Sequence, residues 1–413
     1  MADSDTEVVI VGGGAAGLAA ARRLHEAAIR CLVVEARPRL GGRAWTVTDG
    51  SGHALDLGCG WLHSADRNPW SAIAQAQRRS IDKTPPPWER PSLAVGFPLA
   101  EQLDFLKAQQ ALDARLDRVT EQSADSAAAA FLDPADRWNE LMNAVSTYYS
   151  GAELDCVSAL DLARYHDSGV NWRVVEGYGA TISGYGADFP VVLECPVRRI
   201  DHSGRRLKVE TAKGVITADQ AIVTLPTSVL ADDKVQFTPA LPEKAEAATG
   251  LPLGLADKLF LSLDGADEFE RDSRLFGRTD RSKTAAYHLR PFGRPRIETY
   301  FGGRLAWELE AEGEQAFFDF AVSELAGLLG SAFARRVKPV QFHRWGADPF
   351  SRGSYSYALP GKADCREKLA APVDNRLFFA GEACSRNNFS TAHGALETGV
   401  AAAGQVIAER KRS

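Results

Sequence analysis

The sequence predicts an α/β fold built around a parallel sheet, and three features near its start lead to this prediction. Residues 7–11 read Glu-Val-Val-Ile-Val, a run of β-branched residues that is typical of a strand buried on both faces of a parallel sheet. A glycine-rich turn follows directly, and residues 18–28 then form an alanine-rich, helix-favouring stretch. Residues 31–35 are a second apolar strand that ends in an acid. Strand, turn, helix and strand in this order form the βαβ unit of such sheets.

The composition is that of an ordinary folded protein and argues against several functional classes. Of the 413 residues, 45% are hydrophobic and 25% are charged, which is unlike a disordered or low-complexity chain. Lys and Arg total 48 against 54 Asp and Glu, so the formal net charge is −6, whereas nucleic-acid binders normally carry a basic excess. No apolar stretch approaches the roughly 20 residues of a membrane span. We therefore expect no nucleic-acid partner and no membrane insertion.

The spacing of the cysteines and the composition of the first residues both bear on the cellular compartment in which the protein is expected. Six cysteines are scattered along the chain, without a Cys-x-x-Cys pair or a Cys/His cluster. This spacing favours free thiols and supports neither a disulfide framework nor a metal site. The chain starts with acidic residues, unlike the basic start of a signal peptide. We expect a cytoplasmic protein without a metal, and the sequence leaves the oligomeric state open.

The turn after the first strand carries the pattern G-x-G-x-x-G at Gly12, Gly14 and Gly17, with Ala16 inside it. In dinucleotide-binding units the first glycine makes the tight turn, the second lets the backbone approach a pyrophosphate, and the third lets the helix pack on the strand. The helix N-terminus then offers N–H groups and a positive dipole end to the phosphates. Glu35 ends the next strand, where an acid accepts hydrogen bonds from an adenosine ribose. The order of these parts predicts a dinucleotide site.

NAD and FAD both use this pattern, and the residues after the acid separate them. Ala36 and Arg37 lead into a second glycine turn that ends in Gly42 and Arg43. Such a turn adds backbone N–H groups, and an arginine grips phosphate in a bidentate fork. The run from Glu35 resembles the flavin-containing amine oxidase superfamily, whose members carry E-A-x-x-x-x-G-G-R at this place. The resemblance implies FAD as the cofactor.

Five further segments resemble the same superfamily, which includes the monoamine and polyamine oxidases. They are residues 54–63, 195–200, 221–226, 377–382 and 391–399. The first resembles a D-L-G-x-x-W-x-H segment of the polyamine oxidase branch, and the last resembles the helix whose N-terminus faces the flavin ring. The resemblance assigns further residues to FAD, with the Val197 backbone at the adenine. These residues are Gly58, Cys59, Gly60, Trp61, Val197, Gly381, Glu382, Thr391 and Ala392.

The implied architecture is a Rossmann-type FAD-binding domain interleaved with an α+β substrate-binding domain, because the flavin motifs lie at both ends and in the middle of the chain. We assign residues 1–68, 172–250 and 352–413 to the FAD-binding domain. Residues 69–171 and 251–351 form the substrate-binding domain, and the resemblance is thin from about residue 65 to 170. No long insertion is present that could form a coiled-coil tower, which argues against a histone demethylase.

Hydrophobic spacing predicts several elements inside the substrate-binding domain. Residues 98–165 are expected to be largely helical, with a leucine stripe that packs into the core. The stripe consists of Leu99, Leu103, Leu106, Leu112 and Leu116. Strands are expected at residues 254–263, 284–289 and 297–301, and a helix at residues 312–329.

The resemblance also assigns the reacting end of the site. Lys258 matches the family lysine that reaches flavin N5 through a water, and a surface lysine on an edge strand is the alternative. Trp345 and Tyr355 lie in a segment resembling W-x-x-D-P-x-S-x-G-S-Y, in which Tyr355 is one wall of an aromatic cage around the amine; core packing is the alternative for both. His63 matches a histidine at the substrate mouth, or is an ordinary hydrogen-bonded histidine. Thr391 stands where monoamine oxidases have the second cage tyrosine.

One position bears on how the flavin is held. Ser354 lies where the monoamine oxidases have the cysteine that bonds covalently to the flavin. A hydroxyl cannot form that thioether. The sequence therefore predicts noncovalent FAD.

These assignments predict an FAD-dependent oxidase of a primary or secondary amine, with oxygen as the acceptor. The products would be an imine, which hydrolyses to an aldehyde or ketone, and hydrogen peroxide. A desaturase or oxidase of an apolar substrate is one alternative. An L-amino-acid oxidase is another, with Arg67 as the candidate for binding its carboxylate. A non-catalytic FAD-binding redox protein is the third, and Lys258 together with residues 345–357 favours the amine oxidase.

Overall fold

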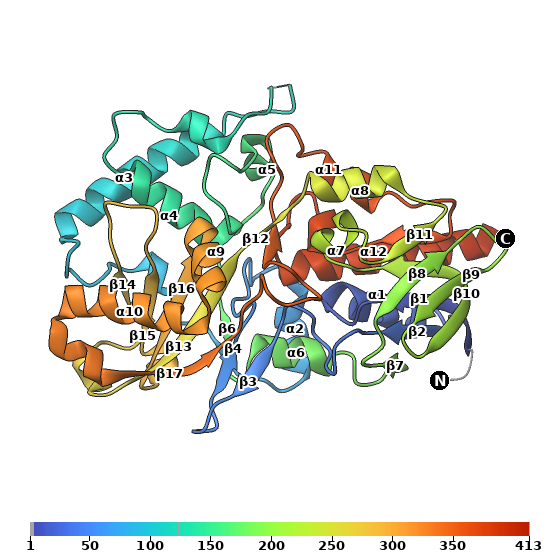
Figure 1. The fold of residues 1–413 in the computed structure, drawn as a ribbon, viewed down its shortest axis with the longest axis horizontal. Coiled ribbons are helices and arrows are strands. Elements are labelled where there is room, and N and C mark those ends of the chain that lie inside the picture. The colour runs from blue at the N-terminus through green and yellow to red at the C-terminus, as the bar shows by residue number, and fades with distance from the viewer. Residues whose placement is uncertain (1–3, 123, 413) are drawn as a thin grey trace.

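The computed structural model describes residues 4–122 and 124–412, and two sheets lie toward opposite ends of an elongated molecule (Figure 1). The larger sheet has, within the described residues, the order β11-β8-β9-β10-β1-β2-β7, with β19 paired to β10. Its parallel centre contains β1 (Ser4–Val11), β2 (Cys31–Val34), β7 (Val191–Val192), β10 (Gly214–Val223) and β19 (Leu377–Phe379). The other strands are β8 (Val197–Asp201), β9 (Leu207–Thr211) and β11 (Gln236–Thr238).

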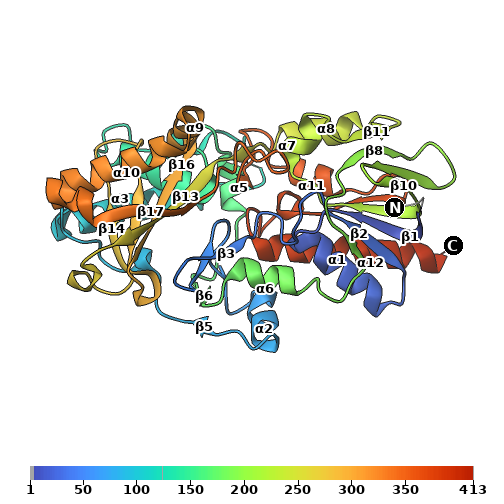
Figure 2. The ribbon, with the colours of Figure 1, turned by 60° about the horizontal axis from the view of Figure 1, so that its bottom comes forward.

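Helices cover both faces of this sheet, as the near-continuous apolar run of β1 requires. Val8 and Ile10 pack toward α1 (Ala15–Glu26) and α12 (Ala392–Arg412). Val9 and Val11 pack into the opposite core. That core includes α7 (Thr227–Ala231), α8 (Pro242–Thr249) and α11 (Cys365–Ala370). Figure 2 shows the two helix layers on either side of the strands. The predicted βαβ unit is confirmed, although the helix starts at Ala15, directly after the glycine turn.

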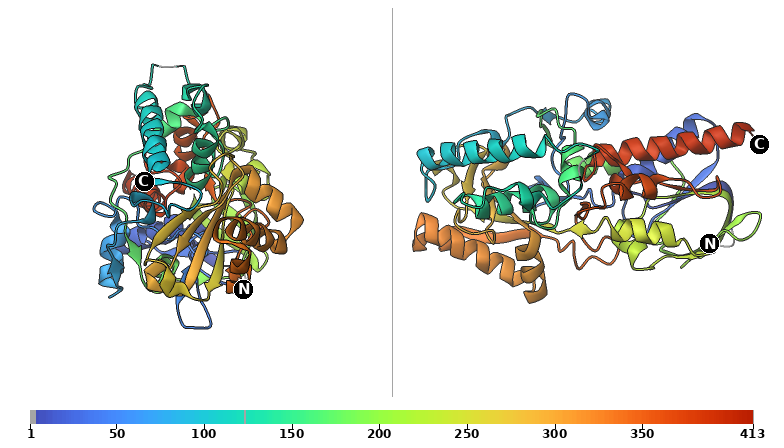
Figure 3. Two further views of the ribbon diagram at one scale, coloured as in Figure 1. Left: turned by 90° about the vertical axis from the view of Figure 1, so that its left-hand side faces the viewer. Right: turned by 90° about the horizontal axis from the view of Figure 1, so that it is seen from above.

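The smaller sheet has the order β14-β15-β16-β13-β17 and is antiparallel throughout. Its strands are β13 (Ala256–Leu263), β14 (Ser273–Phe276), β15 (Ala286–Leu289), β16 (Arg296–Gly302) and β17 (Val337–Phe342). On one face it packs against α9 (Gly303–Glu312) and α10 (Glu314–Leu329). On the other side lie α3 (Leu99–Leu116) and α4 (Asn139–Ser150), as Figure 3 shows. The three expected strands are present, and β14 and β17 were missed. The helix expected at residues 312–329 is α10, and it is separated from α9, which ends at Glu312, by the cap residue Gly313 with φ of +106°.

Short elements complete the chain. The two-stranded pairs are β3 (Thr46–Thr48) with β4 (Ala54–Asp56), β5 (Ile81–Asp82) with β6 (Arg173–Val174), and β12 (Leu253–Gly254) with β18 (Tyr355–Ser356). The remaining α-helices of the described residues are α2 (Pro69–Ala76), α5 (Ala159–Ala163) and α6 (Tyr178–Gly184). None of the described helices is both long and apolar enough to cross a bilayer.

The leucine stripe of α3 corrects one sequence expectation. Leu112 and Leu116 are buried, but Leu99, Leu103 and Leu106 are 54%, 52% and 47% exposed. At about 100° per residue, these three leucines lie roughly 100° or more around the helix from the buried Phe105. The stripe therefore does not form one core-facing row. The long helical stretch expected at residues 98–165 is also divided into separate helices.

The strands of the two sheets follow the proposed domain segments. All strands of the larger sheet fall within residues 1–68, 172–250 and 352–413, and all strands of the smaller sheet fall within residues 251–351. The interleaved α/β architecture is confirmed. The exact domain boundaries stay a prediction.

Candidate active site

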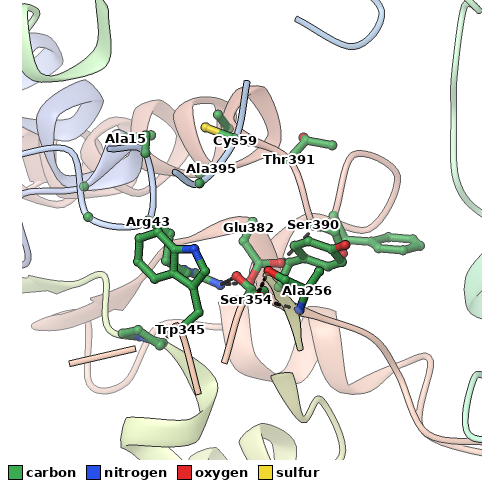
Figure 4. Close-up of a pocket in the computed structure, with 18 of the residues that line it drawn as sticks. Ala15, Arg43, Cys59, Ala256, Trp345, Ser354, Glu382, Ser390, Thr391 and Ala395 are labelled. Carbon is green, nitrogen blue, oxygen red and sulfur yellow. Dashed lines mark hydrogen bonds and ion pairs between the residues drawn. The ribbon is translucent and has the colours of Figure 1, made fainter. Parts of the chain in front are cut away.

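A cavity of about 1210 Å³ lies between the two sheets and gathers residues from many parts of the chain (Figure 4). Its walls include nearly every residue that the sequence assigned to the cofactor or the substrate. These are Gly12, Gly14, Ala16, Glu35, Ala36, Arg37, Gly42, Arg43, Gly58, Cys59, Gly60, Trp61, His63, Val197, Lys258, Trp345, Tyr355, Gly381, Glu382, Thr391 and Ala392. Gly17 is outside the lining. The assignments rest on separate motifs, yet the fold brings them to one space.

The three glycines of the first turn have different surroundings. Gly12 has φ of +110°, and a methyl group there would lie 2.4 Å from the Thr224 hydroxyl oxygen. At Gly17 a methyl would lie 2.0 Å from the carbonyl oxygen of Gly12, because helix and strand touch there. At Gly14 the nearest atom to a methyl would be 3.9 Å away, on Gly42. The turn thus keeps Gly14 open toward the cavity, as close approach of a pyrophosphate requires.

Glu35 fixes the shape of this turn from inside the protein. Its side chain is 4% exposed and accepts hydrogen bonds from the N–H of Gly13 at 2.7 Å and of Arg37 at 2.8 Å. A carboxylate has about four acceptor positions, so each oxygen keeps one for another donor. Glu35 therefore orients the turn and still offers acceptors to ribose hydroxyls.

Two arginines from the second glycine turn form ion pairs across the cavity wall. Arg37 Nη2 lies 2.7 Å from Asp348, and Arg43 Nη1 lies 2.8 Å from Glu382. Burial alone would raise the pKa of Glu382, but the charge of Arg43 and nearby hydrogen bonds outweigh it, so this pKa is lowered. Ser356 and Ser390 fill the remaining acceptor positions of Glu382. Figure 4 shows Arg43 and Glu382 side by side. Glu382 thereby connects the segments that contain Arg43, Ser356 and Ser390. Its direct contact with FAD stays a prediction.

The N-terminus of α12 faces the cavity. The Thr391 hydroxyl accepts from the N–H of Gly394 at 3.0 Å and donates to the carbonyl of Asn388 at 2.6 Å, which caps the helix. Ala392, the first residue of α12, lines the cavity. The hydroxyl of Thr391 is occupied by capping, so substrate binding by this side chain stays a prediction.

The cavity walls formed by the two glycine turns, Glu382 and the N-terminus of α12 fit FAD. The N-termini of α1 and α12 both face the cavity, and helix N-termini favour anionic or electron-rich groups. A methyl at Gly381 would meet nothing within 4 Å, so the backbone there is also open. A register shift in β8 lies directly after Val197, which leaves its backbone irregular at the assigned adenine position. Bound FAD would have its pyrophosphate at α1, its ribose at Glu35 and its ring toward α12.

Lys258 is a buried lysine on an inner strand, which rules out the surface alternative. Its side chain is 7% exposed, and its Nζ lies 2.8 Å from Glu298 and donates to the carbonyl of Asp56 at 3.1 Å. Burial would lower the pKa of Lys258, but the charge of Glu298 and its hydrogen bond outweigh burial, so this pKa is raised. Burial would likewise raise the pKa of Glu298, and Lys258 lowers it instead. Both groups are therefore charged at neutral pH.

An aromatic wall adjoins Lys258. The Tyr355 hydroxyl donates to the carbonyl of Tyr148 at 2.6 Å and lies 3.2 Å from the Tyr300 hydroxyl. Lys258 Nζ is 5.9 Å from the centre of the Tyr300 ring. The Trp345 indole N–H donates to a backbone carbonyl at 3.0 Å, so this ring is held as a rigid wall. Two tyrosines from separate strands and a tryptophan thus form an aromatic wall close to a buried ammonium, and the part of Tyr355 in an amine cage stays a prediction.

Glu298 and Tyr300 were missed by sequence reasoning, although β16 carries a signal for them. Ile297, Thr299 and Phe301 are fully buried, whereas Glu298 and Tyr300 alternate with them and line the cavity. This period of two places an acid and a tyrosine on one face of a strand. Reading that alternation would have predicted both residues.

His63 and Ser354 have ordinary hydrogen-bond partners. His63 Nδ1 lies 2.6 Å from the Asn171 side-chain oxygen, and burial lowers the pKa of His63. It lines the cavity, 6.3 Å from the Trp88 ring. The Ser354 hydroxyl accepts from the N–H of Ala256 at 2.9 Å and donates to its carbonyl at 2.8 Å. Among the described residues, no cluster of His, Cys, Asp and Glu is arranged to hold a metal ion.

A sheet with a dinucleotide turn, joined to a cavity with a buried lysine and tyrosines, defines an FAD-dependent oxidoreductase. The chain belongs to the flavin containing amine oxidoreductase family, which it matches over residues 15–407. It is 29% identical to polyamine oxidase 5 of Oryza sativa subsp. japonica, over 97% of this chain and 87% of that protein. It is 31% identical to polyamine oxidase 2 of Arabidopsis thaliana, over 96% of this chain and 87% of that protein.

A solved structure shows the same fold. A redesigned double mutant of putrescine oxidase superposes with a TM-score of 0.77 and 17% sequence identity, over 98% of this chain and 100% of that one. The predicted membership, FAD cofactor and amine oxidase activity are confirmed, and the desaturase, amino-acid oxidase and non-catalytic alternatives are not favoured.

Proposed function

We propose that this enzyme oxidises a primary or secondary amine to an imine, which water hydrolyses to an aldehyde or ketone. In this proposal FAD is held noncovalently and oxygen is the acceptor, giving hydrogen peroxide. The observation that carries it is the buried Lys258 ammonium beside Tyr300 and Tyr355 in the cavity. FAD, when bound, supplies the two-electron acceptor for the C–N bond.

The protein side chains prepare the amine for oxidation. The charge of Lys258 disfavours a second ammonium nearby, which lowers the pKa of the bound amine and favours its reactive neutral form. Tyr300, Tyr355 and Trp345 enclose the amine with aromatic faces and exclude bulk water. The Lys258 ammonium also offers a fixed positive charge that stabilises the negative charge developing as oxygen is reduced.

The test of this function is anaerobic reduction of the bound flavin by a panel of polyamines, arylalkylamines, cyclic amines and amino acids. We expect bleaching by amines, and peroxide when air is admitted. Lys258→Met should slow reoxidation strongly while the flavin stays bound. A wild-type flavin that no amine bleaches would contradict the proposed reaction, and an unchanged reoxidation rate in the variant would remove Lys258 from it.

Noncovalent binding and the compartment have their own tests. Ser354 uses its hydroxyl on Ala256 and has no sulfur, which supports a flavin that acid precipitation releases into the supernatant. Flavin that stays with the precipitate would contradict this. The six cysteines are free, which supports a reducing, cytoplasmic location. Cell fractionation that recovers the enzyme outside the cytoplasm would overturn it.

A further inference from the structure

Three cations of the cavity lining have no acidic partner among the described residues: Arg198 and Lys234 are exposed to water, whereas Arg274 is half-buried. Arg274 lies on β14, at the edge of the smaller sheet, and lines the cavity. Arg37, Arg43 and Lys258 also line it, and each has a carboxylate oxygen within 2.8 Å. For the Arg274 guanidinium, the described part of the chain provides neither an ion pair nor a hydrogen bond. A charge removed from water is costly unless something pairs with it.

The position of Arg274 is nonetheless fixed. Its carbonyl accepts from the N–H of Leu93 at 2.8 Å and from the Ser92 hydroxyl at 3.0 Å. Its guanidinium carbon lies 3.9 Å from the centre of the Phe276 ring. Burial lowers the pKa of Arg274 to about 10, so the group stays charged at neutral pH. The strand and the aromatic ring hold a cation in place while its five N–H donors stay available.

The sheet register places Arg274 far from the reacting end of the site. Arg274 pairs with His288, His288 pairs with Glu298, and Lys258 pairs with Tyr300, so all five point to the same side of the sheet. Three strand spacings, about 14 Å at the backbone, separate the strands of Arg274 and Lys258. A ligand group at Arg274 is therefore remote from the carbon that is oxidised.

Neighbouring acids do not neutralise this cation. Glu298 is committed to Lys258, and His288 Nε2 lies 3.0 Å from the buried Asp272. Asp113 of α3 and Asp117, directly after this helix, also line the cavity, but both are exposed and neither forms an ion pair with Arg274. An incoming anion is the group that would complete the wall at Arg274.

We propose that Arg274 binds a carboxylate at the far end of the substrate, so that the substrate class is amines with a remote carboxylate, such as ω-amino acids. This inference rests on the proposed function and names its substrate class. The planar guanidinium matches a carboxylate in a bidentate fork. An α-amino acid is too short to reach both ends, and a polyamine would bring a second ammonium toward the guanidinium.

Steady-state kinetics with ligands of matched length test this proposal. The panel is ω-amino acids of six to ten carbons, with the n-alkylamines and α,ω-diamines of the same lengths. For the best length, we expect kcat/KM for the amino acid to exceed that for the alkylamine by about tenfold or more, the value of one charged hydrogen-bonded pair. Arg274→Gln should lower kcat/KM for the amino acid far more than for the alkylamine, so that the preference is lost, and Arg274→Lys should keep part of it. Arg278→Gln is the matched control, because Arg278 pairs with Asp280 at the surface and does not line the cavity.

A binding measurement separates this proposal from the proposed function. Octanoate, which has no amine to oxidise, should raise the melting temperature of the wild-type holoenzyme and of Arg278→Gln, but not that of Arg274→Gln. If octanoate acts equally on all three, or if the kinetic preference is absent or survives in Arg274→Gln, the carboxylate site is wrong. If no amine of any class reduces the flavin, the proposed function fails, and the octanoate comparison still decides the role of Arg274.

Discussion

At the scale of single residues, Lys258 and Glu298 form the buried ion pair on which the proposed chemistry depends. Each alone would be unfavourable in a buried site, because burial disfavours the charged form of both. Together they are 2.8 Å apart, and each shifts the pKa of the other toward its charged form. The pKa of Lys258 is raised above 10.5 and that of Glu298 is lowered below 4.5. The pair therefore stays ionised between these values.

Removing the carboxylate should expose the effect of burial on the lysine. In Glu298→Gln the charge that raises the pKa of Lys258 is gone while burial remains, so this pKa falls toward the working range. We expect flavin reoxidation to slow as the pH rises from about 6 to about 10, because Lys258 then loses its proton. The wild-type rate should stay nearly flat over the same range. Stopped-flow mixing of the reduced enzyme with oxygen measures both.

The matched control for this variant is Glu308→Gln. Glu308 is 51% exposed on α9 and pairs with Lys283 away from the cavity. Its reoxidation profile should match that of the wild type. Profiles of Glu298→Gln and wild type that coincide at every pH would show that Glu298 does not hold the proton on Lys258.

At the scale of elements, two glycines of the first βαβ turn are expected to have different roles: Gly17 lets the helix pack on the strand, and Gly14 leaves room for the cofactor. Gly17→Ala places a methyl 2.0 Å from a backbone oxygen and should destabilise the apoprotein by about 2–3 kcal/mol. Gly14→Ala has room in the fold and should cost about 1 kcal/mol or less as a poorer helix cap. The new methyl at residue 14 would point into the open space, so FAD affinity should fall at least about tenfold, a loss of about 1.4 kcal/mol.

Two measurements check this pair of variants. Urea unfolding of each apoprotein gives the free energy of unfolding, and quenching of FAD fluorescence gives the affinity. Gly327→Ala is the control, because this glycine lies in α10 and a methyl there meets nothing within 4 Å. Equal losses of FAD affinity and apoprotein stability in Gly14→Ala would mean that Gly14 serves the fold alone.

Elements also show what the sequence could predict. The βαβ unit was predictable because its signals are local: a β-branched run, glycines at fixed spacing and an acid at the end of a strand. The exposed Leu99, Leu103 and Leu106 were not predicted, because apolar spacing alone does not show which side of α3 meets another element. The alternation in β16 places Tyr300 on one face of the strand, but its contact with Tyr355 was not predictable, because Tyr355 lies on another strand.

At the scale of the whole molecule, the long-range motifs predicted that distant segments share one cavity, but not the contacts that join them. Arg37 follows the second strand and Asp348 follows β17, yet they form a buried ion pair at 2.7 Å. No local pattern relates positions 311 residues apart. The family resemblance supplied the order of the motifs, and the packing of the two sheets determined which acid faces which arginine. The sequence also did not predict that Arg274 lacks an acidic partner, because this depends on which side chains the fold places around it.

The contribution of the Arg37–Asp348 ion pair to the free energy of unfolding should depend on pH. Burial alone would raise the pKa of Asp348, but the His343 hydrogen bond and the charge of Arg37 outweigh it, so this pKa lies below its ordinary 3.8. A depressed carboxylate pKa contributes stability that is present above the unfolded value and is lost as the pH falls through the folded value. Asp348→Asn leaves buried Arg37 with only the more distant Glu35, 4.0 Å away, and should cost about 3 kcal/mol at pH 7.

The stability gap between wild type and Asp348→Asn should therefore remain full at pH 5 and begin to shrink only below about pH 4, as Asp348 becomes protonated in the unfolded state and then in the native state. Urea unfolding of both proteins at pH 7, 5 and 3 measures the gap. Asp188→Asn is the matched control, because Asp188 is 74% exposed, lies 3.5 Å from Arg22 and should contribute little at any pH. A gap that is as large at pH 3 as at pH 7 would show that the carboxylate acts through its shape and hydrogen bonds and not through its charge.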